Sequence, residues 1–329
     1  MDQAVATRQT GNVVLFVGTE SAYWGLKDYE VASQTARAMG VDSLAVKCAD
    51  GENRWYRDIS QIREQRSTVL SQGCGYIPYT YMYGPKFGNS QIDGEVAILK
   101  ELMSVSDGIV CGDLEVEWNN QVGGAQHLAQ VMSHNSGVFI VTTWADPLVQ
   151  GWSGVMEALS AVVDVWVPQQ YTNWLALQES TLSNLGAHVI QPAIELVSEF
   201  GGNNPIDNAV LAKSRGHKTL WIWEYGQARS NPNLVRSCAA IIGKTLTSAQ
   251  SVNIQQKHPT PTVATPATKS YTIQSGDTLA SIAVKLGIAN WWQDLYVANL
   301  NTLSVVAHQH GQEVSASLIY PGTKLTYKV

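Results

Sequence analysis

Three acidic residues stand at alternate positions in the run GDLEVEW, residues 112–118. Because the side chains of a strand alternate between its two faces, Asp113, Glu115 and Glu117 are expected to share one face, with the intervening aliphatic residues toward the helices. Crowded carboxylates raise the pKa of at least one member, which then keeps its proton near neutral pH. Such a group can protonate the leaving oxygen of a glycosidic bond. Glu117 is the preferred general acid and Glu115 the second choice; a solvent-facing strand or a cation site is the alternative.

Polar and aromatic residues also end the other short β-rich runs. Those expected to contact a substrate are Tyr83, Trp118, Trp144, Gln169, Tyr171, Glu195, Trp223 and Glu224. Glu195 could supply a second carboxylate, and Gln169 and Tyr171 could donate to an acetamido group. Trp223 and Glu224 have opposite parity, so either the Glu or the Trp faces the substrate; a helix-facing Trp is the alternative. The 11 Trp and 13 Tyr against 4 Phe suit stacking on sugar rings.

The histidines and cysteines do not form recognisable sites. The seven histidines lack HExxH-type spacing and the four cysteines form no CxxC pair, so neither a metal nor another cofactor is expected. The cysteines are expected to be free and buried. Lys47 and Asp50, at the end of one β-rich run, could pair with each other or bind sugar hydroxyls.

Eight β-rich runs that alternate with helical stretches would position these residues. The runs cover residues 12–18, 43–51, 75–84, 108–118, 138–146, 163–172, 187–196 and 219–227. Helices are expected at residues 29–39, 92–104, 125–133, 175–185, 205–214 and 233–247. The alternation predicts a parallel sheet, and eight units of this size predict a (β/α)8 TIM barrel with its site at the C-terminal strand ends. An open doubly wound sheet is the alternative, although no GxGxxG follows the first run.

The acidic run on the fourth β-rich segment resembles the strand-four motifs of two families of TIM-barrel glycoside hydrolases. Family 25 lysozymes carry D-x-E there, which matches Asp113 and Glu115. Family 18 chitinases carry D-x-D-x-E, which matches Asp113 and Glu117 with Glu115 in the middle. The resemblance implies a glycosidase whose proton donor is one of the two Glu residues. The chain departs from family 25 at strand one, where it has GTE (residues 18–20), and from family 18 at strand six, where it has QQY (residues 169–171).

The C-terminal part has a different composition. A Pro- and Thr-rich stretch, residues 255–269, predicts an extended linker between a barrel of residues 1–254 and a module of residues 270–329. The module opens with SYTIQSGDTLASIA from residue 270 and closes with LIYPGTKL at residues 318–325, a pattern similar to LysM domains. The resemblance implies a small α+β fold of order βααβ that binds N-acetylglucosamine polymers.

Two loops of this module are implied to form a glycan groove. The residues concerned are Gly276, Asp277 and Thr278 in the first loop and Leu318 and Ile319 in the second. Asp277 is also the expected N-cap of a helix that starts at Thr278. A second helix is expected at residues 291–298, with Asn299 or Asn301 in the Asn position of the family pattern. The alternative is a module used in phage-tail assembly without sugar binding.

Composition and charge limit the classes of function. The 329 residues are 45% hydrophobic with a net charge of -6, which allows a large core and argues against nucleic acid as a partner. No apolar run is long enough to span a membrane and no signal peptide pattern is present, so synthesis in the cytoplasm is expected. The sequence predicts an endolysin-like enzyme that hydrolyses β-1,4 bonds of peptidoglycan or a chitin-like polymer, acting at the wall after release or on a phage-like particle. The alternative is a non-catalytic glycan-binding or structural protein that contacts other proteins of such a particle.

Overall fold

The chain divides into two units, Met1–Gln250 and Ser251–Val329, each described here by itself. The computed structural model describes residues 11–143, 151–169, 179, 182–196, 204–243, 268–288, 295, 299, 302–303, 306, 309–310 and 319–328. The predicted linker, residues 255–269, lies outside this set up to residue 267. None of the helices in the described part of the chain is long and apolar enough to cross a bilayer.

Eight parallel strands of the first unit form a barrel. They are β1 (Val13–Val17), β2 (Ser43–Asp50), β4 (Gly75–Met82), β5 (Ile109–Leu114), β6 (Val138–Thr143), β7 (Val165–Pro168), β8 (Ala193–Glu195) and β9 (Leu220–Trp223). The strands pair in the order β7-β6-β5-β4-β2-β1-β9-β8. Parallel bridges from Trp166 to Ile190 and from Gln169 to Ala193 connect β7 to the β8 side and complete the circle. The predicted (β/α)8 fold is therefore confirmed; a short strand, β3 (Asn53–Arg54), adds an antiparallel extension to β2.

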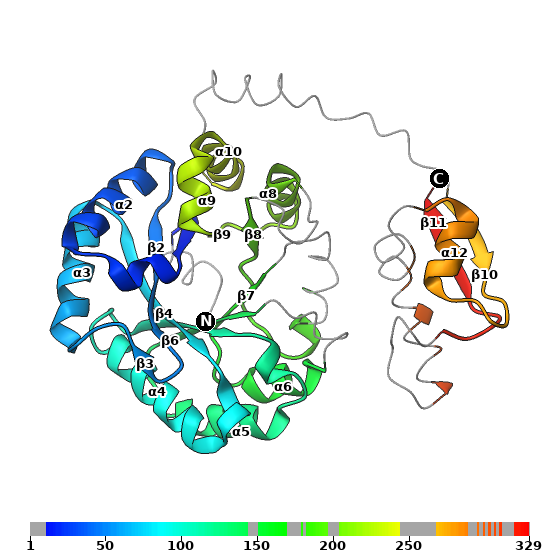
Figure 1. The fold of residues 1–329 in the computed structure, drawn as a ribbon, viewed down its shortest axis with the longest axis horizontal. Helices are drawn as coiled ribbons and strands as arrows, with labels where there is room; N and C mark the ends of the chain where they lie inside the picture. The colour runs from blue at the N-terminus through cyan, green and yellow to red at the C-terminus, as the bar shows by residue number, and fades with distance from the viewer. Residues whose placement is uncertain are drawn as a thin grey trace. The chain divides into compact units, whose positions relative to one another are not determined.

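Helices surround the barrel and connect its strands (Figure 1). They are α2 (Leu26–Ala38), α3 (Ile59–Ser71), α4 (Asn89–Met103), α5 (Val122–Met132), α6 (Ser153–Leu159), α8 (Pro205–Ser214), α9 (Tyr225–Ser230) and α10 (Pro232–Ile242). Three 3-10 helices follow strands: η1 (Thr19–Tyr23), η2 (Gly84–Phe87) and η3 (Val116–Trp118). Local chemistry sets the start of α8. The Asn204 side chain accepts the Ile206 N–H at 3.0 Å, and Pro205 is the first residue of the helix, where the sequence predicted it. The helix predicted at residues 175–185 lies largely outside the described residues.

Apolar side chains fill the barrel interior. Val14, Phe16, Tyr79, Cys111 and Trp221 belong to one buried cluster, separate from the larger cluster between the strands and the helices. The Phe16 ring centroid lies 5.4 Å from that of Tyr79 and 5.1 Å from that of Trp221. Since these rings occupy the interior, a ligand site has to lie at the mouth, where the strands end.

The acidic run leaves the sheet earlier than the sequence indicated. Strand β5 ends at Leu114, because its pairing with β4 ends at the Met82–Leu114 pair. Glu115 follows the strand, and Glu117 lies within η3. The expectation that both intervening aliphatic residues face the helices holds for Leu114, which is buried in the outer cluster, but is wrong for Val116, which is 49% exposed.

The second unit contains a two-stranded antiparallel sheet and a helix. Strand β10 (Thr268–Thr272) pairs with β11 (Lys324–Lys328), and α12 (Leu279–Leu286) follows the first turn. Buried Ile273, Leu279, Ile282, Leu295 and Leu325 form its apolar interior. The strand, helix and strand agree with the predicted order; of the second helix expected at residues 291–298, only residue 295 is described.

Candidate active site

The inward-facing positions change from apolar to polar at the C-terminal ends of the strands. Residues two positions beyond the inner core share its face, because side chains alternate along a strand. The layer formed in this way contains Lys47, Tyr81, Asp113, Thr142, Gln169, Glu195 and Trp223. Each comes from a different strand or, for Gln169, from the residue directly after β7, so the closed sheet gathers residues that are far apart in the sequence.

An amide and two carboxyl groups form the centre of this layer. Nε2 of Gln169 donates to Oδ1 of Asp113 and to Oε1 of Glu115, both at 3.2 Å. Thr142 Oγ1 lies 3.4 Å from the same nitrogen. Because both oxygens bond to the same nitrogen, Oδ1 of Asp113 and Oε1 of Glu115 can lie no farther apart than two hydrogen-bond lengths. Asp113 is only 3% exposed, whereas Glu115 is partly accessible at the mouth.

Burial is the main cause of the altered acidity of both groups. It raises the pKa of Asp113 well above the usual range, and the charge of Glu115 raises it further. Burial also raises the pKa of Glu115; the Gln169 hydrogen bond opposes this shift, and the charge of Glu117 adds to it. The Lys47 ammonium lowers both pKa values without cancelling the effect of burial. The crowding expected from the sequence therefore exists, and it favours proton retention on Asp113 and Glu115.

Glu117 contacts the aromatic side of the mouth. Tyr81 donates its hydroxyl to Oε2 of Glu117 at 2.8 Å. The Tyr81 ring lies 4.9 Å from the Tyr83 ring, and the Tyr83 hydroxyl lies 3.4 Å from Oδ2 of Asp50. Glu117 and Tyr83, both predicted site residues, are thus brought to the same region as Asp113 and Glu115.

Lys47 provides a positive charge beside these acids. Its ammonium lies 3.1 Å from Oδ1 of Asp50, which agrees with the pairing considered from the sequence. It also lies over the rings of Trp55 and Tyr81, 5.1 and 5.2 Å from their centroids. The ion pair and the two rings hold Lys47 in place, so it acts on the pKa values of the acids as a fixed charge.

Glu95 is a buried acid that the sequence gave no reason to select. Its carboxylate accepts the backbone N–H of Tyr83 at 2.8 Å, that of Gly84 at 3.1 Å and the Gln91 amide at 2.9 Å. Glu95 is fully buried on α4, and burial raises its pKa to about 7. These bonds hold the loop that carries Tyr83, so Glu95 positions a mouth residue from behind. Its spacing on the helix is that of any core-facing residue, and no motif marked it.

The remaining predicted residues of the mouth have different positions. Trp118 is fully buried, and its Nε1 donates to the Met82 carbonyl at 2.8 Å, so its ring is not available to a ligand and we exclude it from the proposed site. Glu195 and Trp223 lie opposite each other in the β8–β9 pairing, on the inner face, and the partly exposed Trp223 ring lies 5.3 Å from Phe16. Glu224 also reaches the mouth, since a Cβ on Gly18 would lie 3.5 Å from its Oε2. Trp144 and Tyr171 lie outside the described residues.

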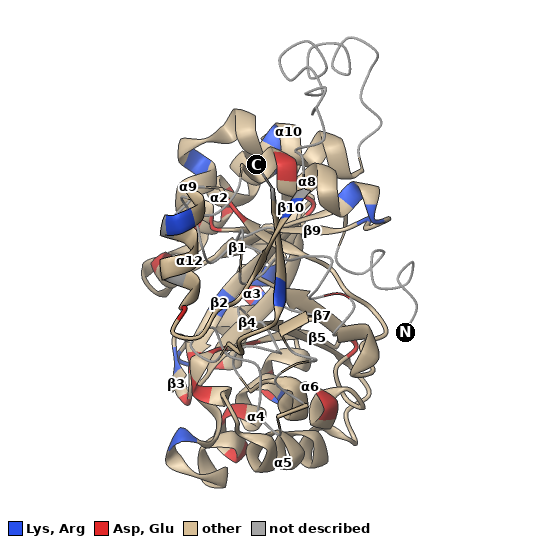
Figure 2. Ribbon diagram, turned by 90° about the vertical axis from the view of Figure 1, so that its right-hand side faces the viewer, with Lys and Arg blue, Asp and Glu red and all other residues tan. Residues whose placement is uncertain are grey.

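The arrangement is suited to proton transfer. A partly exposed carboxyl group with a raised pKa can donate a proton to a ligand oxygen, and neighbouring carboxylates can stabilise positive charge that develops beside it. Within the described residues, no group of three or more His, Cys, Asp or Glu is placed to hold a metal ion. Lys and Arg are scattered over several elements and do not follow one helix (Figure 2).

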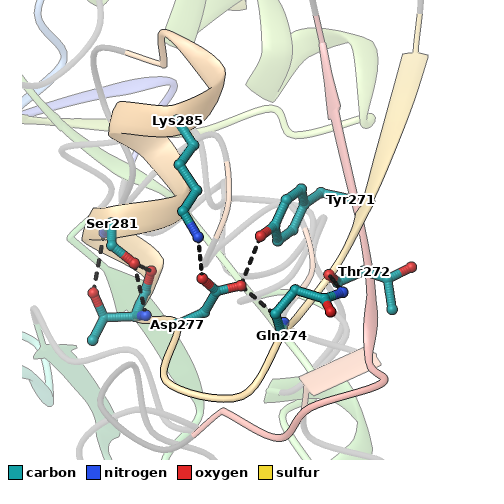
Figure 3. Close-up of polar contacts among 7 residues, drawn as sticks. Tyr271, Thr272, Gln274, Asp277, Ser281 and Lys285 are labelled. Atoms are coloured by element: carbon teal, nitrogen blue, oxygen red, sulfur yellow. Dashed lines mark hydrogen bonds and ion pairs between the residues drawn. The ribbon is translucent and has the colours of Figure 1, made fainter.

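A different carboxylate organises the first loop of the C-terminal unit (Figure 3). Asp277 accepts the Tyr271 hydroxyl at 2.7 Å, the Gln274 N–H at 2.8 Å and the Lys285 ammonium at 2.5 Å. Together these bonds lower the pKa of Asp277 to about 2, and the bond from Lys285 makes the largest contribution. Asp277 therefore holds strand, turn and helix together.

The cap of α12 differs from the expectation. The Ser281 N–H donates to Oγ1 of Thr278 at 3.0 Å, and the Thr278 N–H donates to Oγ of Ser281 at 2.9 Å. This reciprocal pair makes Thr278 the N-cap, so the assignment of that role to Asp277 was wrong, because the Asp277 oxygens are engaged elsewhere. Gly276 is exposed at φ +84° in the turn, where a side chain would be strained. Ile319 is partly exposed, and Leu318 lies outside the described residues.

Hydrogen bonds from Asn299 connect Leu295 to Thr326 of strand β11. The Asn299 side-chain amide donates to the carbonyls of Leu295 and Thr326 at 2.7 and 2.8 Å, and its Oδ1 accepts the Thr326 N–H at 2.6 Å. Asn299 is 4% exposed. Of the two Asn residues considered for the family position, Asn299 therefore has a structural role, and Asn301 is outside the described residues.

Comparison with known proteins agrees with this division. Residues 271–327 match the LysM domain family, so the C-terminal unit contains a LysM domain. The comparison with curated proteins finds no match for the chain.

Among solved structures, the chain is similar to a glycoside hydrolase family 5 enzyme from Prevotella bryantii B14, in complex with a xyloglucan tetradecasaccharide. The two share 10% identity over 74% of this chain and 99% of that chain, with a TM-score of 0.50. A β-mannanase from Streptomyces thermolilacinus with mannohexaose matches at 11% identity over 70% and 92%, TM-score 0.48. A sugar phosphate isomerase/epimerase from Parabacteroides distasonis matches at 12% over 70% and 94%, TM-score 0.45. At these identities the likeness shows the fold, and the resemblance to families 25 and 18 stays a prediction.

Proposed function

We propose that the chain is a glycoside hydrolase that cleaves β-1,4 bonds in peptidoglycan or a chitin-like polymer and is held on that polymer by its LysM domain. The observation that carries the proposal is the state of Glu115. It is partly accessible at the barrel mouth, its pKa is raised by burial, and Gln169 holds it at 3.2 Å. These are the requirements for a general acid that protonates a leaving glycosidic oxygen.

The roles of the neighbouring acids follow from their partners. Asp113 is buried beneath Glu115 and shares its amide donor, so a proton on Asp113 removes one negative charge from the acid's surroundings. Glu117, bonded to the Tyr81 hydroxyl, supplies a carboxylate beside the developing oxocarbenium charge. Glu195 on β8 is the second candidate for that role. Glu115 replaces Glu117 as our preferred proton donor, because burial raises its pKa, Gln169 holds its carboxyl group in place, and the group is still partly accessible.

The LysM domain contributes by tethering. A glycan that is already bound to the LysM domain is present at the barrel at a raised effective concentration. This increases turnover on an insoluble wall without any new contact in the site. The likeness in fold to an enzyme that was crystallised with a xyloglucan oligosaccharide supports a polysaccharide as substrate. We propose that the protein acts at the cell wall, after release from the cell or on a phage-like particle.

The proposal is tested by the release of reducing ends from purified peptidoglycan and chitin oligosaccharides. Glu115→Gln keeps the size of the side chain and removes the proton, so kcat should fall by about 10²–10⁴-fold. Glu117→Gln should reduce kcat less, since it removes charge stabilisation and leaves the acid in place. The matched control is Glu157→Gln on the exposed face of α6, which should change nothing.

Two outcomes would reject this assignment. A protein that binds these glycans but releases no reducing ends would be the non-catalytic glycan-binding component considered from the sequence. If circular dichroism shows that both proteins are folded and Glu115→Gln is as active as the wild type, another group donates the proton.

A further inference from the structure

A second pair of carboxyl groups lies at the mouth, on the β1 and β9 side. Glu20 is in η1, and Glu224 directly follows β9. Both lean over the same glycine: a Cβ placed on Gly18 would lie 3.3 Å from Oε2 of Glu20 and 3.5 Å from Oε2 of Glu224. The negative charge of each carboxyl group therefore lies close to the other, and the charge of Glu224 raises the pKa of Glu20.

The surrounding loops fix this pair in place. The Ser21 hydroxyl shares its one proton between the Lys47 carbonyl oxygen, at 2.8 Å, and the Gly18 carbonyl oxygen, at 2.9 Å, which holds η1 against the end of β2. The Trp24 ring lies edge-on to Tyr29 and to Tyr225, at 5.2 and 5.3 Å, and so joins the loop after β1 to helix α9 after Glu224. The proximity of Glu20 and Glu224 is therefore built by two separate loops that pack on each other.

Polar atoms around this pair lack protein partners. Oε1 of Glu20 is buried and accepts no hydrogen bond from any described residue. The hydroxyl of Tyr79 is likewise buried without a partner in the described part of the chain, and the residue is 0% exposed. Tyr79 faces inward from β4. Burial is the main cause of the raised pKa of its hydroxyl, and Asp113, Cys111, Glu20 and Glu224 add to the shift in that order. A buried polar atom without a partner is costly, so a ligand that supplies the missing bonds would gain free energy.

The charges of the mouth indicate what kind of ligand this is. The carboxyl groups in or beside the mouth are those of Glu20, Asp50, Asp113, Glu115, Glu117, Glu195 and Glu224. Lys47 is the cation among the mouth residues described above, and it is already paired with Asp50. A further negative charge placed among these carboxyl groups would be repelled, whereas a positive charge would relieve the mutual repulsion that raises the pKa of Glu20 after burial. The site therefore favours a group that is positive and donates hydrogen bonds.

We propose that Glu20, Glu224 and Tyr79 form a subsite for the free 2-ammonium group of a glucosamine residue, so that the barrel prefers incompletely N-acetylated glycan. An ammonium has three donors and no acceptor, which matches the orphan Oε1 of Glu20, a Glu224 oxygen and the Tyr79 oxygen. An acetamido group is neutral and bulkier, and it presents a carbonyl that carboxylates cannot bind. The inference rests on the proposed action on glycans, but it concerns binding and not cleavage.

The test measures binding to the full chain by tryptophan fluorescence, at a pH where the amine is charged. The probes are a glucosamine tetrasaccharide and an N-acetylglucosamine tetrasaccharide. For Glu20→Gln the affinity for the glucosamine probe should fall by about tenfold, the loss expected for one charge-assisted hydrogen bond, with the N-acetyl probe unchanged. Because both proteins contain the LysM domain, its contribution cancels in this comparison. Tyr79→Phe removes the hydroxyl group and keeps the ring, so it should weaken binding of the glucosamine probe several-fold. It is the variant to use if Glu20→Gln fails to fold.

Defined results would overturn the proposal. Equal losses of affinity for both probes in Glu20→Gln would do so, as would an unchanged affinity of Glu20→Gln for the glucosamine probe. A third probe, Nα-acetyl-lysine amide, separates sources of ammonium: if it binds as tightly as the glucosamine probe, the subsite recognises a peptide amine and not an amino sugar. Hydrolysis is measured separately, so an amine preference without cleavage would support this subsite and reject the hydrolase, and cleavage without an amine preference would do the reverse.

Discussion

Carboxyl groups in the barrel mouth and in the LysM turn have opposite surroundings. Asp277 has donors from a hydroxyl, a backbone N–H and an ammonium, and its pKa is lowered to about 2. Asp113 and Glu115 share one amide donor, lie next to other acids and have raised pKa values. The same functional group thus stabilises a fold in one unit and has a raised pKa in the other, as the proposed proton transfer requires.

This difference distinguishes acidic residues that stabilise the fold from acidic residues that can exchange a proton with a ligand. An acid whose acceptors are all used by protein donors gains nothing from a ligand, whereas an acid with too few donors and too many like charges can exchange a proton. Glu95 lies between these extremes, since it has three donors but is fully buried. The following variants would sharpen or break this comparison, from the largest expected effect to the smallest.

Removal of the shared amide should affect the mouth most. Gln169→Leu leaves Asp113 and Glu115 without their common donor, so kcat should fall by about 100-fold through loss of positioning. Because the Gln169 hydrogen bond lowers the pKa of Glu115, its loss raises that pKa further, and the alkaline limb of the kcat profile should move to higher pH. The matched control is Gln126→Leu, exposed on α5. A drop in kcat with an unmoved alkaline limb would show that Gln169 does not act through Glu115.

Loss of the charge at the LysM turn should impair wall binding and leave the barrel alone. Asp277→Asn weakens the bonds to Lys285 and to the Gln274 N–H, so the LysM domain should melt at a lower temperature and pull-down on peptidoglycan should weaken several-fold. Hydrolysis of a soluble oligosaccharide should stay the same.

This prediction has a definite pH dependence. The pKa of Asp277 is lowered in the fold, so its stabilising effect is complete above the ordinary value of 3.8 and disappears as the pH falls toward about 2. Wild-type LysM should therefore lose thermal stability across that range, and Asp277→Asn should not. Parallel curves for the two proteins would show that the turn does not depend on this charge.

Glu95 should make stability depend on pH in the opposite direction. Its pKa is raised from 4.5 to about 7, so it favours the folded state most below pH 4.5 and loses that effect as the pH rises through 7. Relative to Glu95→Gln, the wild type should therefore be more stable at pH 5 than at pH 8 in chemical denaturation. A constant difference between the two proteins would mean that Glu95 does not titrate in this range.

The smallest effect is expected from Tyr81→Phe. This change removes the hydroxyl bonded to Glu117 and keeps the ring that packs on Tyr83. Since Glu117 stays in place, kcat should fall by only about fivefold, as expected for one hydrogen bond. A loss as large as that of Glu115→Gln would indicate that Glu117 is the proton donor after all.

The sequence predicted the architecture better than the roles of individual residues. Alternating β-rich and helical runs specify a barrel locally, and the LysM motif is carried by residues that are close in the chain. Trp118 was misplaced because burial depends on what packs over it, here the loop at Gly84, where a Cβ would lie 2.4 Å from the Trp118 ring. The N-cap at Thr278 was missed because the three-dimensional position of Lys285 decides where Asp277 points.

The amino-acid sequence alone determined the order of strands and helices, the LysM pattern and the presence of three closely spaced acids at the end of the fourth strand. Only the tertiary structure decided which of these acids is buried, that Gln169, 56 residues beyond Asp113, donates to two of them, and that Glu20 and Glu224 lie over the same glycine. The reason is physical: periodicity and turn preference act between neighbours in the chain, whereas the acidity of a carboxyl group is set by solvent exclusion and by partners that barrel closure brings from other strands.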